Sequence, residues 1–342
     1  MTNDDKFCGG LADADDAPAL APPSATPNWT ENLWWIAHDG KTNIGLMTHL
    51  GSTRHDFNVV RQTVMLMLPD GRVATDVSVG GFREPGKVRG ATLTMEYIKP
   101  FREWRVSSNG VTQLATLDEL WNNSPRQGPR VPLNFDLKAE CLGPVWEAGA
   151  GDDTQHMQQQ EWAKSHYQQT IRLSGSIELD GVRHAFDATG VRDHSRGPRD
   201  FGTWHGHALC SAPYKSGRSF GLFAVFGAGG TTALRTAYVV KDGIMERGVP
   251  RAIPPLSRAF LGRNESFTLE IEVGGRVETI KVRTHGGGLL SMLAPYDVTP
   301  GIWRERPGGI ALGEALASFE WDGETSYGIV ERSAPADSLP TI

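Results

Sequence analysis

Residues 267–282 read FTLEIEVGGRVETIKV, and this stretch decides the fold class. Apolar and polar residues alternate from Phe267 to Val273, so every second side chain points to the same face of a β-strand. The pair Gly274-Gly275 permits the positive φ angles of a tight two-residue turn, and a second strand pattern follows over residues 277–282. The segment therefore predicts an antiparallel hairpin with one buried face and one solvated face.

The same pattern occurs four more times, each with an Asp-Gly pair between two apolar runs. Asp and Gly tolerate the left-handed φ angles of a type I′ turn, so such pairs favour short antiparallel connections. Helical patterns are confined to residues 117–122 and 155–164. We therefore predict an all-β protein made of antiparallel β-barrels with few short helices. The four pairs are Asp70-Gly71, Asp180-Gly181, Asp242-Gly243 and Asp322-Gly323.

The length of the chain, 342 residues, favours two domains. Strand patterns extend over residues 29–200 and again over residues 201–342, which we interpret as two barrel-like halves with a joint near residues 190–205. Residues 1–28 combine several Asp residues with an Ala- and Pro-rich tract and offer little to bury. We expect them to form a disordered tail.

The charge composition argues against several classes of partner. The 34 Lys and Arg residues are outnumbered by 40 Asp and Glu residues, the formal net charge is -6, and no basic run occurs. A basic patch is the usual footprint of nucleic-acid and anionic-membrane binding, so we expect neither partner. Cys8, Cys141 and Cys210 form no paired motif, and the first residues show no secretory pattern. We expect a cytoplasmic protein without stable membrane insertion.

Ionisable and aromatic residues gather between His166 and His207. The strand-like pattern that begins at Gly190 places Asp193 and His194 on opposite faces, so one of the two can face a barrel interior. A carboxyl group in apolar surroundings has a raised pKa and can donate a proton near neutral pH, and a nearby His can serve as base or relay. The stretch therefore suggests an acid–base site around Asp193.

Two other interpretations of this stretch stay open. The Asp and Arg side chains of residues 192–200 are also typical of an ion-pair network that fixes a loop at a domain junction. The spacing of His205 and His207 puts both imidazoles on one face of a strand, as in β-barrel metal sites, although further ligands would have to come from elsewhere. The glycine-rich segments 227–230 and 286–288 lack the context of a dinucleotide site, and no nucleophile-elbow or Walker motif occurs.

Residues 190–199, GVRDHSRGPR, resemble a block of the hydroxyneurosporene synthase or carotenoid hydratase-like proteins of the lipocalin-like (calycin) superfamily. The resemblance implies two lipocalin-like barrels in tandem and an enzyme that needs no cofactor. Hydratases of that family add water to an isoprenoid double bond, and related fungal proteins catalyse pericyclic ring closure. Asp193 matches the proposed proton donor and His166 its upstream helper. Supporting segments are HYQQ at 166–169, the hairpin over 175–186, PFREWRV at 100–106 and FEWDGETSYGIVE at 319–331.

The surroundings of Asp193 are more cationic than in that family, because Arg192 precedes it and Ser195-Arg196 follows it where a Trp is common. This difference favours a substrate that carries a carboxylate, phenolate or ketone. We predict a cofactor-independent hydratase, isomerase or lyase for a hydrophobic isoprenoid, steroid or aromatic compound, with Asp193 and His166 as catalytic residues. The predicted substrate-binding residues are Tyr167, Arg192, His194, Trp204, His205 and His207.

Two alternatives assign these residues other roles. A carrier that binds a hydrophobic molecule without chemistry would hold Asp193 in a salt bridge with Arg192 or Arg199. A metal-dependent enzyme would use His205 and His207. In the favoured interpretation the partner is a hydrophobic small molecule, no metal or other cofactor takes part, and exposed strand edges allow a homodimer.

Overall fold

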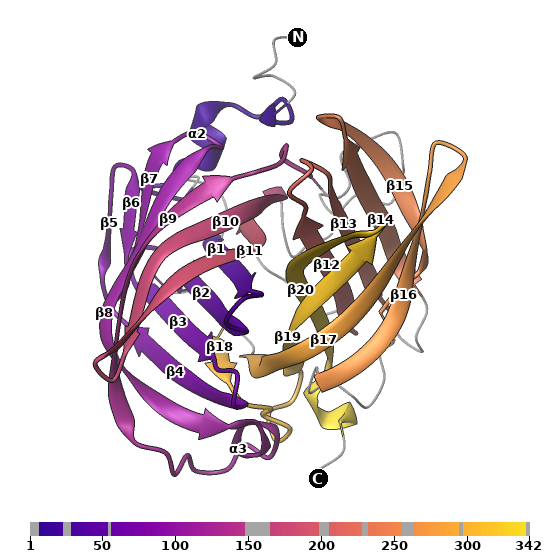
Figure 1. Ribbon diagram of the computed structural model, residues 1–342. Coiled ribbons are helices and arrows are strands. Elements are labelled where there is room, and N and C mark those ends of the chain that lie inside the picture. The colour runs from indigo at the N-terminus through magenta and orange to yellow at the C-terminus, as the bar shows by residue number, and fades with distance from the viewer. Residues whose placement is uncertain are drawn as a thin grey trace.

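The computed structural model describes residues 7–22, 29–53, 56–147, 165–197, 205–227, 232–254, 263–293 and 297–339. These residues form two antiparallel sheets that lie side by side (Figure 1), so the predicted all-β class is confirmed. The first sheet contains β1 (Thr30–Asp39), β2 (Ile44–Ser52), β3 (Val60–Met67), β4 (Arg72–Val79), β5 (Phe82–Glu84), β6 (Lys87–Arg89), β7 (Leu93–Lys99), β8 (Glu103–Thr116), β9 (Arg130–Cys141), β10 (Ser165–Leu179) and β11 (Val182–Gly197). The second contains β12 (His207–Pro213), β13 (Ser219–Phe226), β14 (Thr232–Lys241), β15 (Ile244–Ala252), β16 (Arg263–Val273), β17 (Arg276–Leu293), β18 (Asp297–Pro300), β19 (Ile310–Trp321) and β20 (Glu324–Pro335).

Both sheets close into barrels. The first has the strand order β4-β3-β2-β1-β11-β10-β9-β8, and pairing of β8 with β4 joins its ends. The second has the order β16-β15-β14-β13-β12-β20-β19-β17, and pairing of β16 with β17 joins its ends. Tandem barrels are therefore the architecture, as predicted. The chain changes sheet after Gly197, and residues 198–204, next to the predicted boundary at residue 200, lie outside the described residues.

Most of the predicted Asp-Gly turns have the expected backbone, with both residues left-handed. The loop at Asp70-Gly71 differs, because only Gly71 is left-handed, at φ 86°, and its N–H donates to the Leu68 carbonyl at 3.0 Å. Pro69 fixes the φ angle typical of a type I turn, so this loop is a type I turn followed by a left-handed glycine. The fully left-handed pairs are Asp180-Gly181, Asp242-Gly243, Asp322-Gly323 and Gly274-Gly275.

Alternation along the strands builds a core inside each barrel and a third core between them. In β1, Leu33 and Trp35 point into the first barrel, whereas Trp34 and Ile36 point towards the second barrel. The strands between the barrels are therefore buried on both faces, and β2 has no exposed residue. The core between the barrels includes Met47, Met65, Leu209, Leu289, Leu312 and Ile329.

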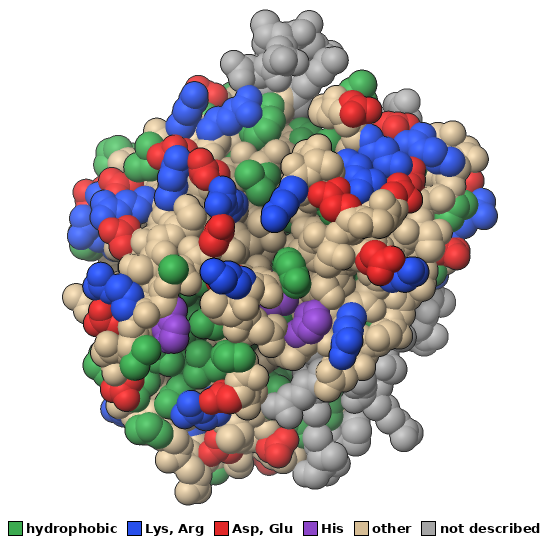
Figure 2. Space-filling model, viewed as in Figure 1, with side chains coloured by type: hydrophobic (Ala, Val, Ile, Leu, Met, Phe, Trp, Pro, Cys, Tyr) green, Lys and Arg blue, Asp and Glu red, His purple; other side chains and the backbone are tan. Residues whose placement is uncertain are grey.

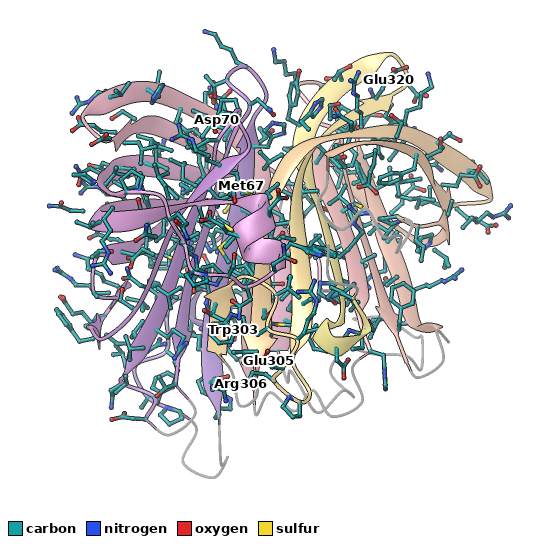
Figure 3. All side chains as sticks on the ribbon, turned by 90° about the horizontal axis from the view of Figure 1, so that it is seen from below. Met67, Asp70, Trp303, Glu305, Arg306 and Glu320 are labelled. Carbon is teal, nitrogen blue, oxygen red and sulfur yellow. The ribbon has the colours of Figure 1, made fainter. Side chains whose placement is uncertain are left out.

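Helix α3 (Leu117–Trp121) confirms the short helix predicted at residues 117–122. The Thr116 hydroxyl accepts a hydrogen bond from the Glu119 N–H at 3.2 Å, and the Glu119 carboxylate accepts one from the Thr116 N–H at 2.6 Å. Seen from below, the helix lies at the junction of the two barrels (Figure 3), where its apolar residues join the core between them. The helix predicted at residues 155–164 lies outside the described residues. No described helix is long and apolar enough to cross a membrane.

The described part of the N-terminal segment, residues 7–22, differs from the disordered tail that we expected. It contains α2 (Asp13–Asp16) and lies over one end of the first barrel (Figure 1). Asp16 is fully buried, and its Oδ2 accepts hydrogen bonds from the Phe101 N–H at 2.6 Å and the Trp104 indole N–H at 3.3 Å. The acidic composition suggested solvation, but one of the acidic side chains instead satisfies buried donors inside the barrel.

The surface carries charges of both signs. On the face shown in Figure 2, Lys and Arg side chains alternate with Asp and Glu side chains, without a broad basic area. Several of these residues pair across strands, as Arg105 does with Asp136 and Arg172 with Asp187. The absence of nucleic-acid and anionic-membrane partners stays a prediction from composition.

The pairing of β1 with β11 depends on a residue without a side chain. A Cβ atom at Gly190 would lie 2.0 Å from the Ile36 carbonyl oxygen, which is part of the backbone and cannot move aside easily. We expect Gly190→Ala to lower the free energy of unfolding by about 1–3 kcal/mol, as overpacking does. Gly286→Ala is the matched control, because a Cβ there meets nothing within 4 Å. Urea unfolding measures both variants, and equal midpoints would contradict the close approach of β1 and β11.

Candidate active site

A pocket of about 80 Å³ lies between the two barrels. A buried water needs about 10–15 Å³ by a similar measure, so the pocket has room for several water-sized groups. Strands of both barrels contribute the side chains of its walls, and most of these are apolar or aromatic. They include Trp34, Ile36 and Val191 from the first barrel and Leu209, Phe223 and Leu312 from the second.

His166 and Asp193 both line this pocket. They come from the neighbouring strands β10 and β11, where Gln168 is directly opposite Asp193 and His166 is its diagonal neighbour. His166 Nε2 contacts Asp193 Oδ2, and Gln168 Nε2 donates to the same oxygen at 3.1 Å. The His166 side chain is 6% exposed and the Asp193 side chain 18%. Asp193 therefore holds the imidazole in place while part of its carboxyl group reaches the pocket.

Trp34 of β1 covers the same face of the sheet. It is the partner of Asp193 in the pairing of β1 with β11, so the indole and the carboxyl group are cross-strand neighbours. The Trp34 ring also lies 5.1 Å from the His49 ring, measured between centroids. An aromatic surface beside the acid excludes water from one side of the pocket.

The second barrel contributes a similar pair of side chains, His207 and Glu331. His207 Nε2 contacts Glu331 Oε1, and His207 Nδ1 lies 2.5 Å from the Ser333 hydroxyl. The Phe223 ring neighbours both histidines, with its centroid 6.1 Å from that of His166 and 5.6 Å from that of His207. Two carboxyl-bound histidines from different barrels therefore face one apolar pocket.

Glu314 of β19 stands next to this pair, and we did not anticipate it from the sequence. It is the cross-strand partner of Glu331 and is 1% exposed. Burial and the negative charge of Glu331 raise the pKa of Glu314 well above its ordinary value. One signal could have revealed it, since it is the single charged residue in the run IALGEALASF at 310–319. Glu331 belongs to the segment 319–331, which supported the family resemblance, but its sequence context offered no reason to assign it a chemical role.

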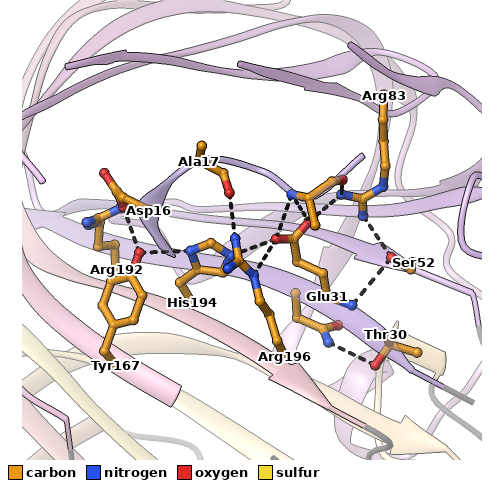
Figure 4. A network of polar contacts seen from close by, with 12 residues as sticks. Asp16, Ala17, Thr30, Glu31, Ser52, Arg83, Tyr167, Arg192, His194 and Arg196 are labelled. Carbon is orange, nitrogen blue, oxygen red and sulfur yellow. Dashed lines mark hydrogen bonds and ion pairs between the residues drawn. The ribbon is translucent and has the colours of Figure 1, made fainter. Parts of the chain in front are cut away.

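Tyr167, Arg192 and His194 occupy the other face of β10 and β11, inside the first barrel (Figure 4). Arg192 Nη1 lies 2.7 Å from Asp16 Oδ1, and the Tyr167 hydroxyl donates to the same oxygen at 2.6 Å. His194 Nε2 lies 2.9 Å from Glu31 Oε1. Because alternate residues of a strand point to opposite faces, these three side chains do not line the pocket. The single site expected from the sequence is thus divided between two faces.

The ion-pair interpretation of residues 192–200 describes one face of β11. Arg192 joins an ion-pair network with Asp16, and Arg196 Nε joins it through Glu31 Oε1 at 2.8 Å. Asp193 lies on the opposite face and contacts His166, so the salt bridge with Arg192 that we expected of a pure carrier does not form. Residues 198–200 lie outside the described residues.

The two histidines of the predicted metal pair have different surroundings. His205 precedes β12 and is exposed, whereas His207 is buried and its two ring nitrogens contact Glu331 and Ser333. Trp204 lies outside the described residues. Among the residues that the structure describes, no group of three or more His, Cys, Asp and Glu side chains is placed to hold a metal ion.

Two closed antiparallel barrels in tandem, with a pocket between them, define a lipocalin-like fold. Among solved structures, the chain is similar to an AttH-like protein from Nitrosomonas europaea, with a TM-score of 0.56 and 11% identity over 93% of this chain and 99% of that chain. Crystal structures of CghA with Sch210972 and of CghA alone have TM-scores of 0.49 and 0.48, both at 14% identity over 96% of this chain and 96% and 95% of theirs. The first of these likenesses supports the fold.

The sequence also matches a family model. Residues 12–336 match the Domain of unknown function (DUF7064), and the chain belongs to that family. The search of curated protein sequences gave no significant match. Membership of the carotenoid hydratase family stays a prediction from the resemblance.

Glu31 and Asp16 dominate the electrostatics inside the first barrel. Burial alone raises the pKa of a carboxyl group, but His194, Arg83 and Arg196 hold the pKa of Glu31 well below its ordinary range. The pKa of Asp16 is lowered in the same way, because Arg192 and hydrogen-bond donors outweigh the effect of burial. Both groups therefore favour the folded state when they are ionised.

We expect the protein to lose stability in acid through these two carboxyl groups. A group whose pKa is lower in the folded state contributes fully above its unfolded-state pKa, about 4 for Asp and Glu, and the contribution is lost as the pH falls further. Urea unfolding between about pH 7 and pH 3 should show a free energy of unfolding that declines below about pH 5. A flat profile over this range would contradict the lowered pKa values of Glu31 and Asp16.

Asp16→Asn isolates one of these contributions. The variant leaves Arg192 buried without its counter-ion, so we expect a loss of about 3–5 kcal/mol at neutral pH and a shallower decline in acid. Asp13→Asn changes an exposed residue of the same short helix and should behave like the wild type. Urea unfolding of the three proteins provides the comparison. Equal stability of Asp16→Asn and the wild type would show that this ion pair does not stabilise the fold.

Proposed function

We propose that the chain is a cofactor-independent acid–base enzyme that acts on a hydrophobic small molecule in the pocket between the barrels. The observation that supports this most is the contact between His166 Nε2 and Asp193 Oδ2 at the edge of a largely apolar pocket. These are the two residues that the sequence selected as catalytic. A hydratase, isomerase or lyase of isoprenoid, steroid or aromatic compounds fits this arrangement, in agreement with the family resemblance.

The pair can move a proton without any further group. In a hydration, the proton of the pair passes to one carbon of a double bond and a water oxygen bonds to the other carbon. The water then returns a proton to Asp193, so atoms and charges balance over the cycle. His166 assists by sharing the proton with Asp193 through Nε2.

The apolar lining serves this chemistry in two ways. The indole of Trp34 and the ring of Phe223 present aromatic faces that stabilise a developing positive charge. Exclusion of water strengthens the electrostatic interactions of the carboxyl group with the reacting atoms. A polar group available to a substrate oxygen is the Gln168 side-chain amide, whereas Arg192 points into the first barrel.

The size of the pocket limits what it encloses. About 80 Å³ is less than the roughly 150 Å³ of an apolar cavity that binds benzene, so the pocket encloses only part of a ring or the end of an isoprenoid chain. We therefore favour a small substrate or the terminal part of a longer one. The runner-up function is a carrier for the same molecules, which the apolar lining also suits.

The test uses deuterium as a label that needs no assumption about the reaction class. Isoprenoid, steroid and aromatic compounds are first ranked by the thermal shift they cause, and organic extracts of the purified protein are analysed by mass spectrometry. The protein is then incubated with each binding compound in D₂O. An enzyme that protonates carbon transfers deuterium to the compound, which the mass spectrum detects, whereas a carrier returns the compound unchanged.

Asp193→Asn is the decisive variant in this assay. We expect it to bind the compound within about threefold of the wild type and to transfer deuterium about 100-fold more slowly, the usual contribution of a general acid or base. Asp187→Asn is the matched control, because Asp187 is an exposed residue of the same strand that pairs with Arg172. Undiminished transfer by Asp193→Asn would overturn the proposed function, as would recovery of the same unchanged compound from the wild type and the variant.

A further inference from the structure

Glu314 is a buried acid for which the proposed function has no role. The described groups that interact with its carboxyl oxygens are the Glu331 carboxyl group and the Trp34 indole, and no cation is among them. A carboxylate that is buried for structural reasons normally has a cation or several donors as partners. Arg332, which follows Glu331 in the sequence, points into the second barrel and pairs with Glu265 at 2.5 Å. Its charge therefore compensates another carboxylate.

Glu314 and Glu331 are best described as two carboxyl groups that share one proton. They are directly opposite each other in the pairing of β19 with β20, at a spacing where like charges repel. Two carboxylates this close in a buried place cannot both ionise easily, so one of them keeps its proton. Counted over the whole residue, Glu314 is 1% exposed and Glu331 is 9% exposed, so burial disfavours the charged form of Glu314 more, and its pKa is raised.

Glu331 connects this shared proton to the pocket. Its side chain lines the pocket and is 12% exposed, and its Oε1 contacts His207 Nε2. The Ser333 hydroxyl beside His207 Nδ1 fixes the orientation of the imidazole. Titratable groups that share these surroundings are His207 from β12 and, on the walls from the first barrel, His166 and Asp193.

We propose that Glu314 and Glu331 form a second proton donor in the pocket, with Glu331 touching the ligand and Glu314 reloading it. The inference rests on the proposed function and deepens it, because each barrel then contributes one acid–base group. The shared proton first passes from Glu314 to Glu331, which leaves Glu314 ionised. Glu331 then gives this proton to the ligand, so its O–H bond breaks and a bond from hydrogen to the ligand forms. The pair takes up one proton from bulk water to return to its starting state.

The division of roles explains why two carboxyl-bound histidines face one pocket. In the proposed hydration, the Glu314 and Glu331 pair, in place of Asp193, supplies the proton that adds to carbon. The His166 and Asp193 pair then accepts the proton that the water releases. The ligand lies between a donor from the second barrel and an acceptor from the first. In this arrangement His207 is a positioning residue that orients Glu331.

The first test measures the proton itself and needs no ligand. The full-length protein at neutral pH should show the infrared C=O stretch of a protonated carboxyl group, which shifts in D₂O. We expect the band in the wild type, in Asp193→Asn and in Glu320→Gln, and its loss in Glu314→Gln. Glu320 is the matched control, because it lies on the same strand, is exposed and pairs with Lys281. A wild type without the band, or a band that survives in Glu314→Gln, would overturn the proposal.

The second test separates this proposal from the proposed function. In the D₂O assay, we expect Glu314→Gln to bind the compound normally and to transfer deuterium about tenfold more slowly or worse. Wild-type transfer by Glu314→Gln together with loss in Asp193→Asn would overturn the second donor and keep the proposed function. Undiminished transfer by Asp193→Asn would overturn both. If Glu314→Gln does not fold, Glu331→Gln replaces it and should lose transfer while the infrared band remains.

Discussion

The pairing of β1 with β11 constrains where every polar group of the first barrel can lie. β1 and β11 are neighbours in the closed sheet of the first barrel. The side chains on one face of these strands point into the first barrel, and those on the other face point towards the second barrel. Its register sets Trp34 against Asp193 and Trp35 against Arg192. A slip of one residue would move Asp193 into the barrel and Arg192 into the pocket, because side chains alternate with a period of two. The acid in the pocket and the cation in the barrel are thus fixed by one register.

The two faces of β11 hold their charges in different ways. Inside the barrel, Arg192 has Asp16 and Arg196 has Glu31, so each guanidinium faces a fixed carboxylate. Such pairs cannot exchange protons readily, because an arginine remains charged under all ordinary conditions. In the pocket, the carboxyl groups of Asp193 and Glu331 contact histidines, and an imidazole, unlike a guanidinium, can act as a proton donor or acceptor. The interior network therefore holds its charges in fixed ion pairs, whereas the groups on the pocket face keep the ability to exchange protons.

The sequence predicted those features that depend on neighbours in the chain. Alternation identified the hairpins and placed Asp193 and His194 on opposite faces, which the structure reproduces. The partners Asp16 and Glu31 could not be predicted, because alternation tells which face a side chain occupies and not what packs against that face. For the same reason, Arg192 was assigned to the substrate. Glu314 was missed because a charged residue inside an apolar strand has no local partner to reveal its surroundings.

The ion-pair partners in the first barrel are far apart in the sequence, so the barrel can close only late in synthesis. Glu31 is made early, whereas Arg196, its partner across 165 residues, leaves the ribosome only when most of the first barrel is complete. Until β11 emerges, β1 has an unpaired edge, and the carboxyl groups of Asp16 and Glu31 remain solvated. Closure of the barrel and burial of its charges are therefore a single late event, and a chain that stops before β11 exposes a strand edge open to association with other chains.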